Sequence, residues 1–403
     1  MRERLKQLGA TELYSPLAVC LYILAYALPV TANFGLMVLA VLGALAAWSG
    51  GISAGAGPRR LWMPVATFVL VTLLTATVSV DVPRSFALSA ALLPSVAICL
   101  LIAGGFTRRE SVDWLLAAHL LVGGGISVAV AVALSRMGWR VPAGYENWIA
   151  RVNCPLLVVS NDLAYLALLA PFAVALWMGG GWWRRVLAGS FLVSALLIAG
   201  VAQRRQVALL LLVMLAGMSL LLRPRWALVS AGAATALMLF IDVALGWPLT
   251  GRFELLWRAG EAGQTGLWDA RLPIWSHAWQ MFLAHPLFGQ GPHTFSYTSV
   301  DGIQVSWAHN LYLETLAEQG VVGLASLVTL LGALLWQATK NWTRARTDDA
   351  PLAAALLTAT VGILLGGLVE FTFLREWLTV LLFTVAGLLA RQEILSGDLP
   401  GKK

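Results

Sequence analysis

The sequence predicts an all-α, polytopic membrane protein with about twelve transmembrane helices. Of its 403 residues, 59% are hydrophobic and only 12% are charged, whereas a soluble domain carries roughly 25% charged residues. The apolar residues come in blocks of about 17 to 25, which is long enough for a helix to cross a hydrocarbon core of roughly 30 Å. Because backbone amides inside lipid must be satisfied within the segment, these blocks are expected to be helices.

One span is placed on each apolar block. The expected spans are roughly 16–32, 34–49, 61–80, 85–104, 112–134, 156–178, 186–202, 206–222, 226–246, 309–336, 352–370 and 376–391. They divide the chain into 1–246 with the first nine spans, a loop domain at 247–308, and 309–403 with the last three spans and a tail. A basic flank precedes the first block and no cleavage site follows it, so we expect this helix to be retained.

The basic residues predict the orientation of these spans. Seventeen of the 27 Lys and Arg residues fall on the side of the N-terminus, so the positive-inside rule predicts cytoplasmic termini in a bacterial inner membrane. The ten on the outer side are all arginines, which suits bidentate contact with the phosphate of a lipid. A general preference of the chain for Arg over Lys explains the same asymmetry. No basic stripe typical of nucleic-acid binding is present.

Two outer loops are long, and long loops in compact proteins are usually functional. The first, at 135–155, carries Arg140, and the second, at 247–308, carries Arg258 and Arg271. Within the second, a helix is predicted to follow Asp269 as its cap and to stop at His285-Pro286, before a turn at 289–292. Its apolar stripe is expected to dock on the membrane interface or on neighbouring spans, or to form a sugar-stacking surface: Trp268, Leu272, Trp275, Trp279 and Phe282.

Several polar residues are candidates for chemistry at the outer surface. His309, expected in the first turn of the long helix after the loop, is either a general base or a histidine that packs at an interface. Arg204 and Arg205 interrupt two apolar spans on the outer side, where a charge is costly and usually functional. Asp162, at the outer end of another span, is a possible partner for an arginine. Glu318 is expected to be structural.

No metal site or cofactor is expected. His277, His285 and His293 recur at intervals of eight residues, but Pro286 and two glycines break the helix between the last two. The outer loops hold no Asp-x-Asp pair, and the chain has no P-loop motif for a nucleotide.

Two motifs resemble the O-antigen ligase and O-antigen polymerase superfamily. The first runs from Arg271 through Trp275 and Pro286 to Gly289-Gln-Gly291, and the second is His309-Asn310-x-Tyr312-Leu313-x-x-x-x-Glu318-x-Gly320-x-x-Gly323. The break at 203–206 resembles a short Ser/Thr-Arg element of the family, although the usual small residue after the arginine is absent. The resemblance covers about 200–323.

The resemblance implies a GT-C-like glycosyltransferase whose helical periplasmic loop helps form an outer site. Its donor would be a glycan on undecaprenyl pyrophosphate, and in the ligase branch its acceptor would be lipid A–core oligosaccharide. By motif, His309 is the general base, Arg271 binds the donor pyrophosphate, and Arg204 or Arg205 supplies a second phosphate contact. Arg258, Asp162 and Arg140 are further candidates on the same face.

The expected reaction is metal-independent and inverts the anomeric carbon. Arginines would meet the charge of the leaving pyrophosphate, and His309 would take the acceptor proton. An O-antigen polymerase or a protein O-oligosaccharyltransferase would use the same donor and remains an alternative. A transporter of lipid or solute is an alternative of another class, although the chain lacks a matching pair of short, Gly/Pro-broken spans.

Overall fold

The computed structural model describes residues 11–26, 32–49, 59–136, 163–201, 205–222, 232, 235–236, 267–299, 302, 304–373 and 375–396. Most of these residues are helical. The helices that surround the core are α2 (Thr11–Tyr26), α3 (Ala32–Trp48), α4 (Arg59–Thr77), α5 (Val82–Ser89), α6 (Leu92–Gly105), α7 (Arg109–Arg136), α8 (Leu163–Met178), α9 (Trp182–Val201), α10 (Arg205–Leu222), α14 (Leu311–Arg344), α15 (Ala350–Gly367) and α16 (Glu376–Ser396).

Within the described residues, six helical segments are long and apolar enough to cross a membrane: Arg60–Thr77, Val82–Gly105, Arg109–Arg136, Trp182–Gly200, Leu311–Arg344 and Ala350–Gly367. Shorter apolar helices accompany them. Large apolar side chains on their outer faces, such as Met63 and Val128, are 69% and 64% exposed, which in a helical bundle of this composition indicates a lipid-facing surface. The expected multi-pass, all-helical class is confirmed, and the number of twelve crossings stays a prediction.

Where the structure describes them, the expected spans coincide with helices, and two of these helical segments are interrupted, one within 85–104 and one at Gly320. The span predicted at 85–104 is divided by a turn at residues 90 and 91 into α5 and α6. Ser85 on α5 donates to the backbone oxygen of Pro292 at 2.7 Å, so this short helix contacts the loop predicted at 247–308. The span predicted at 226–246 falls almost entirely outside the described ranges.

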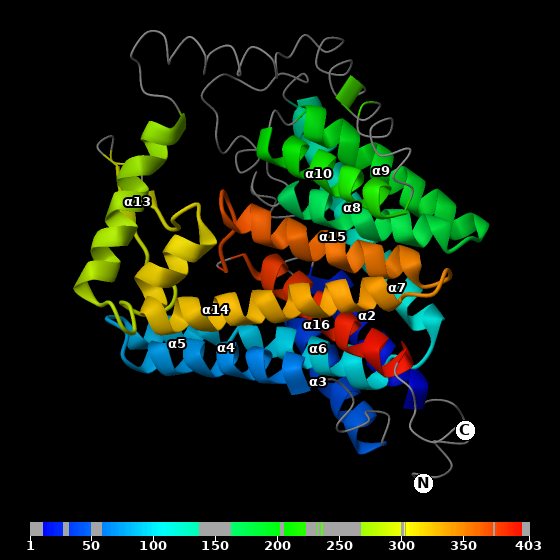
Figure 1. Cartoon of the computed structure of the whole chain (residues 1–403), viewed down its shortest axis with the longest axis horizontal. Helices are drawn as coiled ribbons and strands as arrows, with labels where there is room; N and C mark the ends of the chain where they lie inside the picture. Colours follow the sequence, from blue (N-terminus) through cyan, green and yellow to red (C-terminus); the bar gives the residue numbers. More distant parts are fainter. Residues whose placement is uncertain are drawn as a thin grey trace.

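Helix α8 forms the centre of one half of the bundle. Its residues from Leu163 to Leu176 are buried except Val174, and α7, α9, α10 and α15 pack around it. In the other half, α4 lies along α14 and α6 lies along α16 (Figure 1). The ends of α10, α14 and α15 therefore meet where the two halves adjoin.

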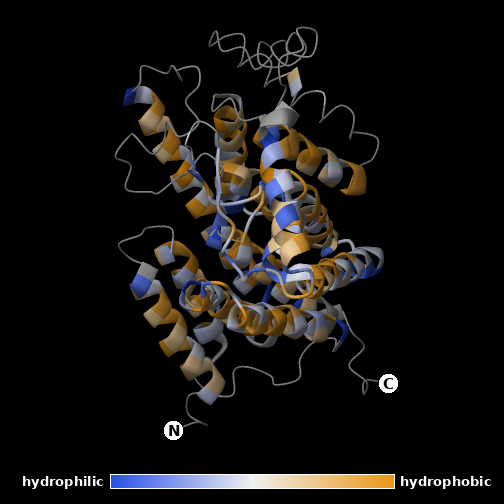
Figure 2. Ribbon diagram, turned by 90° about the vertical axis from the view of Figure 1, so that its left-hand side faces the viewer, coloured by the Kyte–Doolittle hydropathy of each residue, from blue (hydrophilic) through white to orange (hydrophobic). Residues whose placement is uncertain are grey.

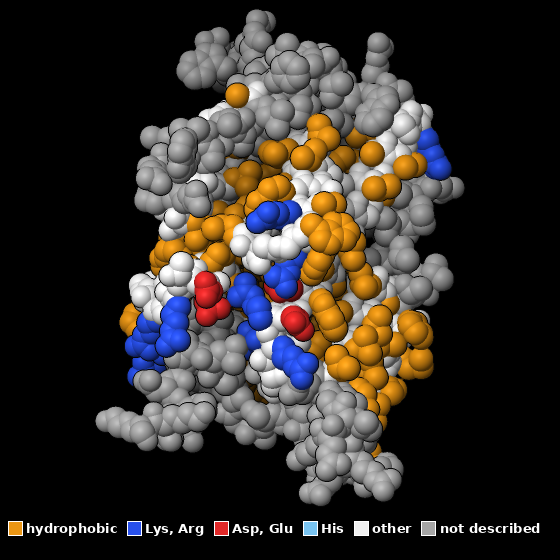
Figure 3. Space-filling model, turned by 90° about the vertical axis from the view of Figure 1, so that its right-hand side faces the viewer, with side chains coloured by type: hydrophobic (Ala, Val, Ile, Leu, Met, Phe, Trp, Pro, Cys, Tyr) orange, Lys and Arg blue, Asp and Glu red, His pale blue; other side chains and the backbone are white. Residues whose placement is uncertain are grey.

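Helix α13 (Leu267–Ala284) lies across one end of the bundle (Figure 1). Figure 2 looks onto this end and shows hydrophilic residues gathered near its middle, with apolar helices around them. At the opposite end, basic and acidic side chains cluster (Figure 3): Arg184 lies 2.7 Å from Asp113, and Arg109 lies 3.2 Å from Asp349. Each end of the bundle thus carries its own polar cluster, with the apolar helices between them.

The face that α13 buries differs from the predicted stripe. Its buried residues are Ile274, Ala278 and Met281, which pack against the core around Phe295. In contrast, Leu272 and Trp279 of the predicted stripe are 52% and 48% exposed. The prediction that the stripe docks on neighbouring spans is therefore wrong for these two side chains. The helix ends before His285 as predicted, but Asp269 is its third residue and not its cap.

Helix α14 is broken near its start. Gly320 has φ 64° and ψ −165°, which is not helical, so a short segment before it and a long span after it meet at a kink. The chain enters α14 from α13 through a loop that contains a two-stranded hairpin of β1 (Tyr297–Thr298) and β2 (Gln304–Val305). This hairpin returns the chain to His309.

Candidate active site

Glu370 is the centre of a polar cluster at the end of the bundle that α13 covers. It lies in the turn that follows α15 and is 7% exposed. Its Oε1 lies 3.1 Å from Nδ1 of His309, and its Oε2 accepts hydrogen bonds of 3.0 Å from Nη2 of Arg271 and from Nε2 of Gln206. One buried carboxylate therefore joins α10, α13, α15 and the segment before α14.

The sequence predicts His309 in the first turn of the long helix, but in the structure it lies just ahead of that turn. Asn310 is the cap of α14, because its Oδ1 accepts from the backbone N–H groups of Tyr312 and Leu313 at 3.0 Å each. His309 itself has φ 53°, in the left-handed region that few residues other than glycine adopt. With this backbone conformation, the imidazole of His309 contacts Glu370.

Side chains on both sides of His309 hold this unusual backbone in place. Glu314 accepts from the N–H of Ala308 at 2.9 Å and from the hydroxyl of Thr372. Nε1 of Trp275 donates to the oxygen of Ala308 at 3.0 Å. Asn310 donates from Nδ2 to the oxygen of Leu368 at 3.1 Å. Non-glycine residues keep a positive φ only where the surroundings over-determine it, and these contacts do so here.

The contact with Glu370 assigns a tautomer to His309. An ionised carboxylate can only accept, so in the neutral imidazole the proton lies on Nδ1 and the second ring nitrogen, Nε2, carries the lone pair. The indole Nε1 of Trp307 also lies 3.1 Å from Nδ1, but a protonated Nδ1 cannot accept from it. Among the residues that the structure describes, Nε2 has no hydrogen-bond partner. The imidazole is 21% exposed and is arranged to take a proton.

Both terminal nitrogens of the Arg271 guanidinium bind the turn that contains Glu370. Nη1 donates to the oxygen of Val369 at 2.6 Å, and Nη2 donates to Glu370 at 3.0 Å. A guanidinium has five N–H donors, so these contacts leave others for a ligand. The side chain is 20% exposed. Arg271 therefore places a positive charge beside the His309–Glu370 pair.

The rim of the cluster carries one further arginine. The guanidinium carbon of Arg375 lies 5.0 Å from the ring centroid of Trp307, within the range of a cation–π contact. Arg375 follows the turn of Glu370 and precedes α16. It brings a second described positive charge to the surroundings of His309.

The glycines of the two motifs serve the fold and not the chemistry. A Cβ on Gly289 would lie 2.2 Å from the carbonyl carbon of Glu318, and one on Gly320 would lie 2.3 Å from the oxygen of Leu287. The loop backbone pairs with the broken helix at this point, since Gly291 donates to Glu318 at 2.7 Å and Val321 donates to Pro286 at 2.9 Å. Gly289 and Gly320 permit this close approach of two backbones.

Glu318 is structural, as expected. Its carboxylate accepts from the N–H groups of His293 and Phe295 at 2.8 and 2.9 Å. His293 is buried in the same loop, and burial, with a smaller effect of Arg84, lowers the pKa of its imidazole to about 4. The histidine is therefore neutral at physiological pH.

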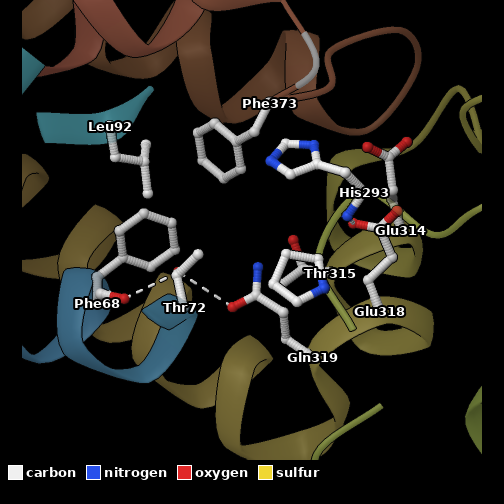
Figure 4. A pocket seen from close by; sticks show the side chains of 10 residues that line it. Phe68, Thr72, Leu92, His293, Glu314, Thr315, Glu318, Gln319 and Phe373 are labelled. Atoms are coloured by element: carbon white, nitrogen blue, oxygen red, sulfur yellow. Dashed lines mark hydrogen bonds between the residues drawn. The ribbon is translucent and has the colours of Figure 1, made fainter. Parts of the chain in front are cut away.

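Figure 4 shows the small cavity behind this loop, where His293, Glu314 and Glu318 face Phe68 and Phe373. Its volume of about 10 Å³ is far below the roughly 300 Å³ of a small-ligand site. A cavity of this size has room for about one water molecule. We conclude that this cavity belongs to the support of the His309 segment and is not a substrate site.

The structure brings two of the predicted site residues together, His309 and Arg271. Arg204, Arg258, Asp162 and Arg140 lie outside the described residues, and α10 begins at Arg205, whose side chain is not described. Gln206, the next residue, does reach Glu370. Glu370, Gln206 and Arg375 were missed by the sequence reasoning. A signal for Glu370 existed, because it is a carboxylate at the end of an apolar span, on the side that the basic residues predict to be the outer one.

These helices and this cluster define a multi-pass helical membrane protein with a histidine–carboxylate–arginine site at one end. A family model described as O-antigen ligase matches residues 196–328. This match over residues 196–328 supports the O-antigen ligase family that the motifs predicted, and the members of that family are membrane enzymes of glycan transfer. The matched region contains Arg271 and His309 but ends before Glu370. A search of curated proteins finds no match to the chain.

Proposed function

We propose that this protein is an O-antigen ligase of the bacterial inner membrane. It transfers O-antigen glycan from undecaprenyl pyrophosphate to lipid A–core oligosaccharide on the periplasmic face. The observation that carries the proposal is the contact of Glu370 with both His309 and Arg271. It joins a proton acceptor and a cation at one end of a membrane bundle.

The proposed reaction is a single displacement. Nε2 of His309 takes the proton of the acceptor hydroxyl as its oxygen attacks the anomeric carbon. The bond from that carbon to the pyrophosphate oxygen breaks, and undecaprenyl pyrophosphate leaves with the bonding electrons. One displacement inverts the configuration at the anomeric carbon. The positive charge that forms on His309 is stabilised by the Glu370 carboxylate, as in other histidine–carboxylate pairs.

The negative charge that develops on the leaving pyrophosphate also has to be stabilised. Arg271 supplies one cation beside the reacting centre, and we propose that Arg204 or Arg205 supplies another. Arg258 and Arg140 are further candidates for the donor, and Asp162 is a candidate partner for one of these arginines. Charge-assisted hydrogen bonds from guanidinium groups are strong enough to stabilise such a leaving group. We therefore propose a metal-independent reaction.

The test is transfer by the purified protein in nanodiscs with an undecaprenyl pyrophosphate-linked glycan and EDTA. Three acceptors are offered separately: lipid A–core, a second lipid-linked glycan, and an acceptor protein. Transfer to lipid A–core that His309→Ala abolishes supports the ligase. Transfer only to the lipid-linked glycan shows a polymerase, and transfer only to protein shows an oligosaccharyltransferase. No transfer to any acceptor overturns the enzyme and favours a transporter.

A further inference from the structure

The two carboxylate oxygens of Glu370 have different partners. Oε1 lies 3.1 Å from Nδ1 of His309, while Oε2 accepts from Nη2 of Arg271 at 3.0 Å. Arginine and carboxylate groups frequently pair through two parallel hydrogen bonds, one to each oxygen. Here the guanidinium binds only one oxygen, and its Nη1 donates to the backbone oxygen of Val369. The division of Glu370 between an arginine and a histidine therefore needs a physical cause.

Gln206 supplies this cause. Its Nε2 donates to Oε2 of Glu370 at 3.0 Å, the same oxygen that Arg271 binds. A carboxylate has about four lone-pair sites on its two oxygens, so two donors fill those of Oε2. Two donors on one oxygen favour the orientation in which the other oxygen points away from them. In the structure that other oxygen, Oε1, contacts His309.

The amide of Gln206 is carried by the start of α10. This helix begins at Arg205, so Gln206 lies in its first turn. Val207, the next residue, is 4% exposed, and Leu211, one turn further on, is 1% exposed. Because α10 packs against α8 and α15, these buried side chains fix the start of the helix. Glu370 follows α15, so the donor and the acceptor of this hydrogen bond belong to two helices in contact.

Without this amide, the guanidinium of Arg271 can take both oxygens of Glu370. It would leave the oxygen of Val369 and close on the carboxylate as a bidentate pair. His309 would then lose the acceptor that holds its proton on Nδ1, and the proton of a neutral imidazole without such a partner can lie on either nitrogen. Arg271 would also lose donors that the proposed function assigns to the pyrophosphate.

We propose that Gln206 is a positioning residue of this site, which keeps Glu370 divided between His309 and Arg271. It acts through the carboxylate and not on the substrate. The effect on the imidazole follows from these contacts alone, whereas the effect on the rate of transfer rests on the proposed function. Because Arg205 is a candidate for the donor pyrophosphate, the same end of α10 would bind the donor and orient the base.

The experiment is solid-state NMR of the full chain in nanodiscs at pH 8, with nitrogen-15 in its five histidines. The two tautomers of a neutral imidazole are distinguished by which ring nitrogen carries the proton. The signal of His309 is assigned by its loss in His309→Asn, and in the wild type it should show the proton on Nδ1. Gln206→Met keeps the length and helix propensity of the side chain, and it should give a mixture with the proton on Nε2.

Gln304 supplies the matched control, because it makes a similar hydrogen bond away from Glu370. Its Nε2 donates to Oγ of Ser296 at 3.1 Å, so Gln304→Met removes one amide donor and should leave the tautomer of His309 unchanged. A second comparison tests the competition with Arg271. In Arg271→Met no guanidinium can close on Glu370, so the further change Gln206→Met should alter the tautomer much less.

Three outcomes overturn the positioning role. The first is an unchanged tautomer in Gln206→Met, and the second is an equal change with and without Arg271. The third is a change in the signal of His293, which is buried at the same end of the bundle, because Gln206 would then support the fold and not this one contact.

The transfer assay separates this role from the proposed function. Gln206→Met should lower kcat roughly tenfold and raise the KM for the donor, while Gln304→Met matches the wild type. If the wild type transfers no glycan but the tautomer of His309 depends on Gln206, the proposed function fails and the positioning role stands. If the wild type transfers glycan and Gln206→Met equals it in tautomer and in kcat, the function stands and the positioning role fails.

Discussion

Oε1 of Glu370 lies 3.1 Å from Nδ1 of His309, while the other oxygen of the same carboxylate accepts from Arg271 at 3.0 Å. The family match ends at residue 328, so the group that orients the candidate base lies some forty residues beyond it. A carboxylate in this position fixes the tautomer of the imidazole and stabilises its protonated form. Arg271 in turn holds the carboxylate in place through its hydrogen bond.

Glu370→Gln is expected to lower kcat by about 10²–10⁴-fold, the usual contribution of a positioned acid or base. The neutral amide no longer stabilises the protonated imidazole, and its NH₂ group can hold His309 in the wrong tautomer. The measurement is the initial rate of glycan transfer at saturating donor and acceptor. Glu370→Asp should keep a larger share of the rate because it keeps the charge.

Glu376 supplies a matched control for this carboxylate. It begins α16, six residues after Glu370, and accepts from the hydroxyl of Tyr26 outside the site. Glu376→Gln should therefore transfer glycan at nearly the wild-type rate. Equal losses in both variants would show that Glu370 serves only the fold of this end of the bundle.

Arg271→Lys is expected to reduce kcat/KM by roughly tenfold or more, because one ammonium cannot span two acceptors that a guanidinium fork spans. In the structure those acceptors are the oxygen of Val369 and the carboxylate of Glu370. Steady-state kinetics with varied donor separate two roles. A rise in the donor KM supports the phosphate contact, whereas a fall in kcat alone assigns Arg271 to positioning. Unchanged kinetics would contradict both.

Glu314 is expected to act through the backbone of His309 and not on the substrate. Glu314→Gln keeps an oxygen for the N–H of Ala308, so it should retain most of the transfer rate. Glu314→Leu removes the acceptor for both Ala308 and Thr372, and a buried unsatisfied donor costs about 1–3 kcal/mol. We expect a fall in kcat with little change in either KM. If Gln is as damaging as Leu, the carboxylate charge itself is needed.

Sequence reasoning identified the helices because each long apolar block has one stable solution in lipid. It also found His309 and Arg271, since both belong to motifs. It could not place Glu370 beside them, because that contact joins residues 61 and 99 positions apart and depends on how α15 packs against α13 and α14. Nor could periodicity reveal that the aromatic stripe of α13 is not its buried face, since Ile274, Ala278 and Met281 have the same helical spacing.

The hydropathy pattern also does not predict the break in α14. The apolar pattern predicts a single span over 309–336, with no division at Gly320. At the break the loop backbone pairs with residues on both sides of Gly320. Gly291 donates to the oxygen of Glu318, and Val321 donates to the oxygen of Pro286. The glycines of the motif pointed to this position, but not to the contact that requires them.

Gly320→Ala is expected to destabilise the protein by more than 1–2 kcal/mol, because it adds a steric clash to an unfavourable backbone conformation. Gly302 separates the two effects: it also has a positive φ, 76°, but a Cβ there meets no atom within 4 Å. Gly302→Ala should cost about 1 kcal/mol, the conformational part alone. Thermal unfolding in detergent measures both. Equal shifts of Tm would contradict the close approach of Leu287 as the cause.

His293 should make the stability of the outer loop fall on acidification. In an unfolded chain its imidazole has a pKa of 6.5, whereas in the folded protein burial lowers this pKa to about 4. Between these two values the unfolded state binds a proton that the folded state does not, so stability rises with pH and is greatest above 6.5. The difference is at most about 3 kcal/mol.

His293→Gln, which cannot titrate, should lose this part of the pH dependence. The measurement is limited proteolysis of residues 285–310 between pH 4 and 7, with His285→Gln as the control because His285 is exposed. A wild-type profile that matches His293→Gln throughout would show that His293 is not neutral by burial.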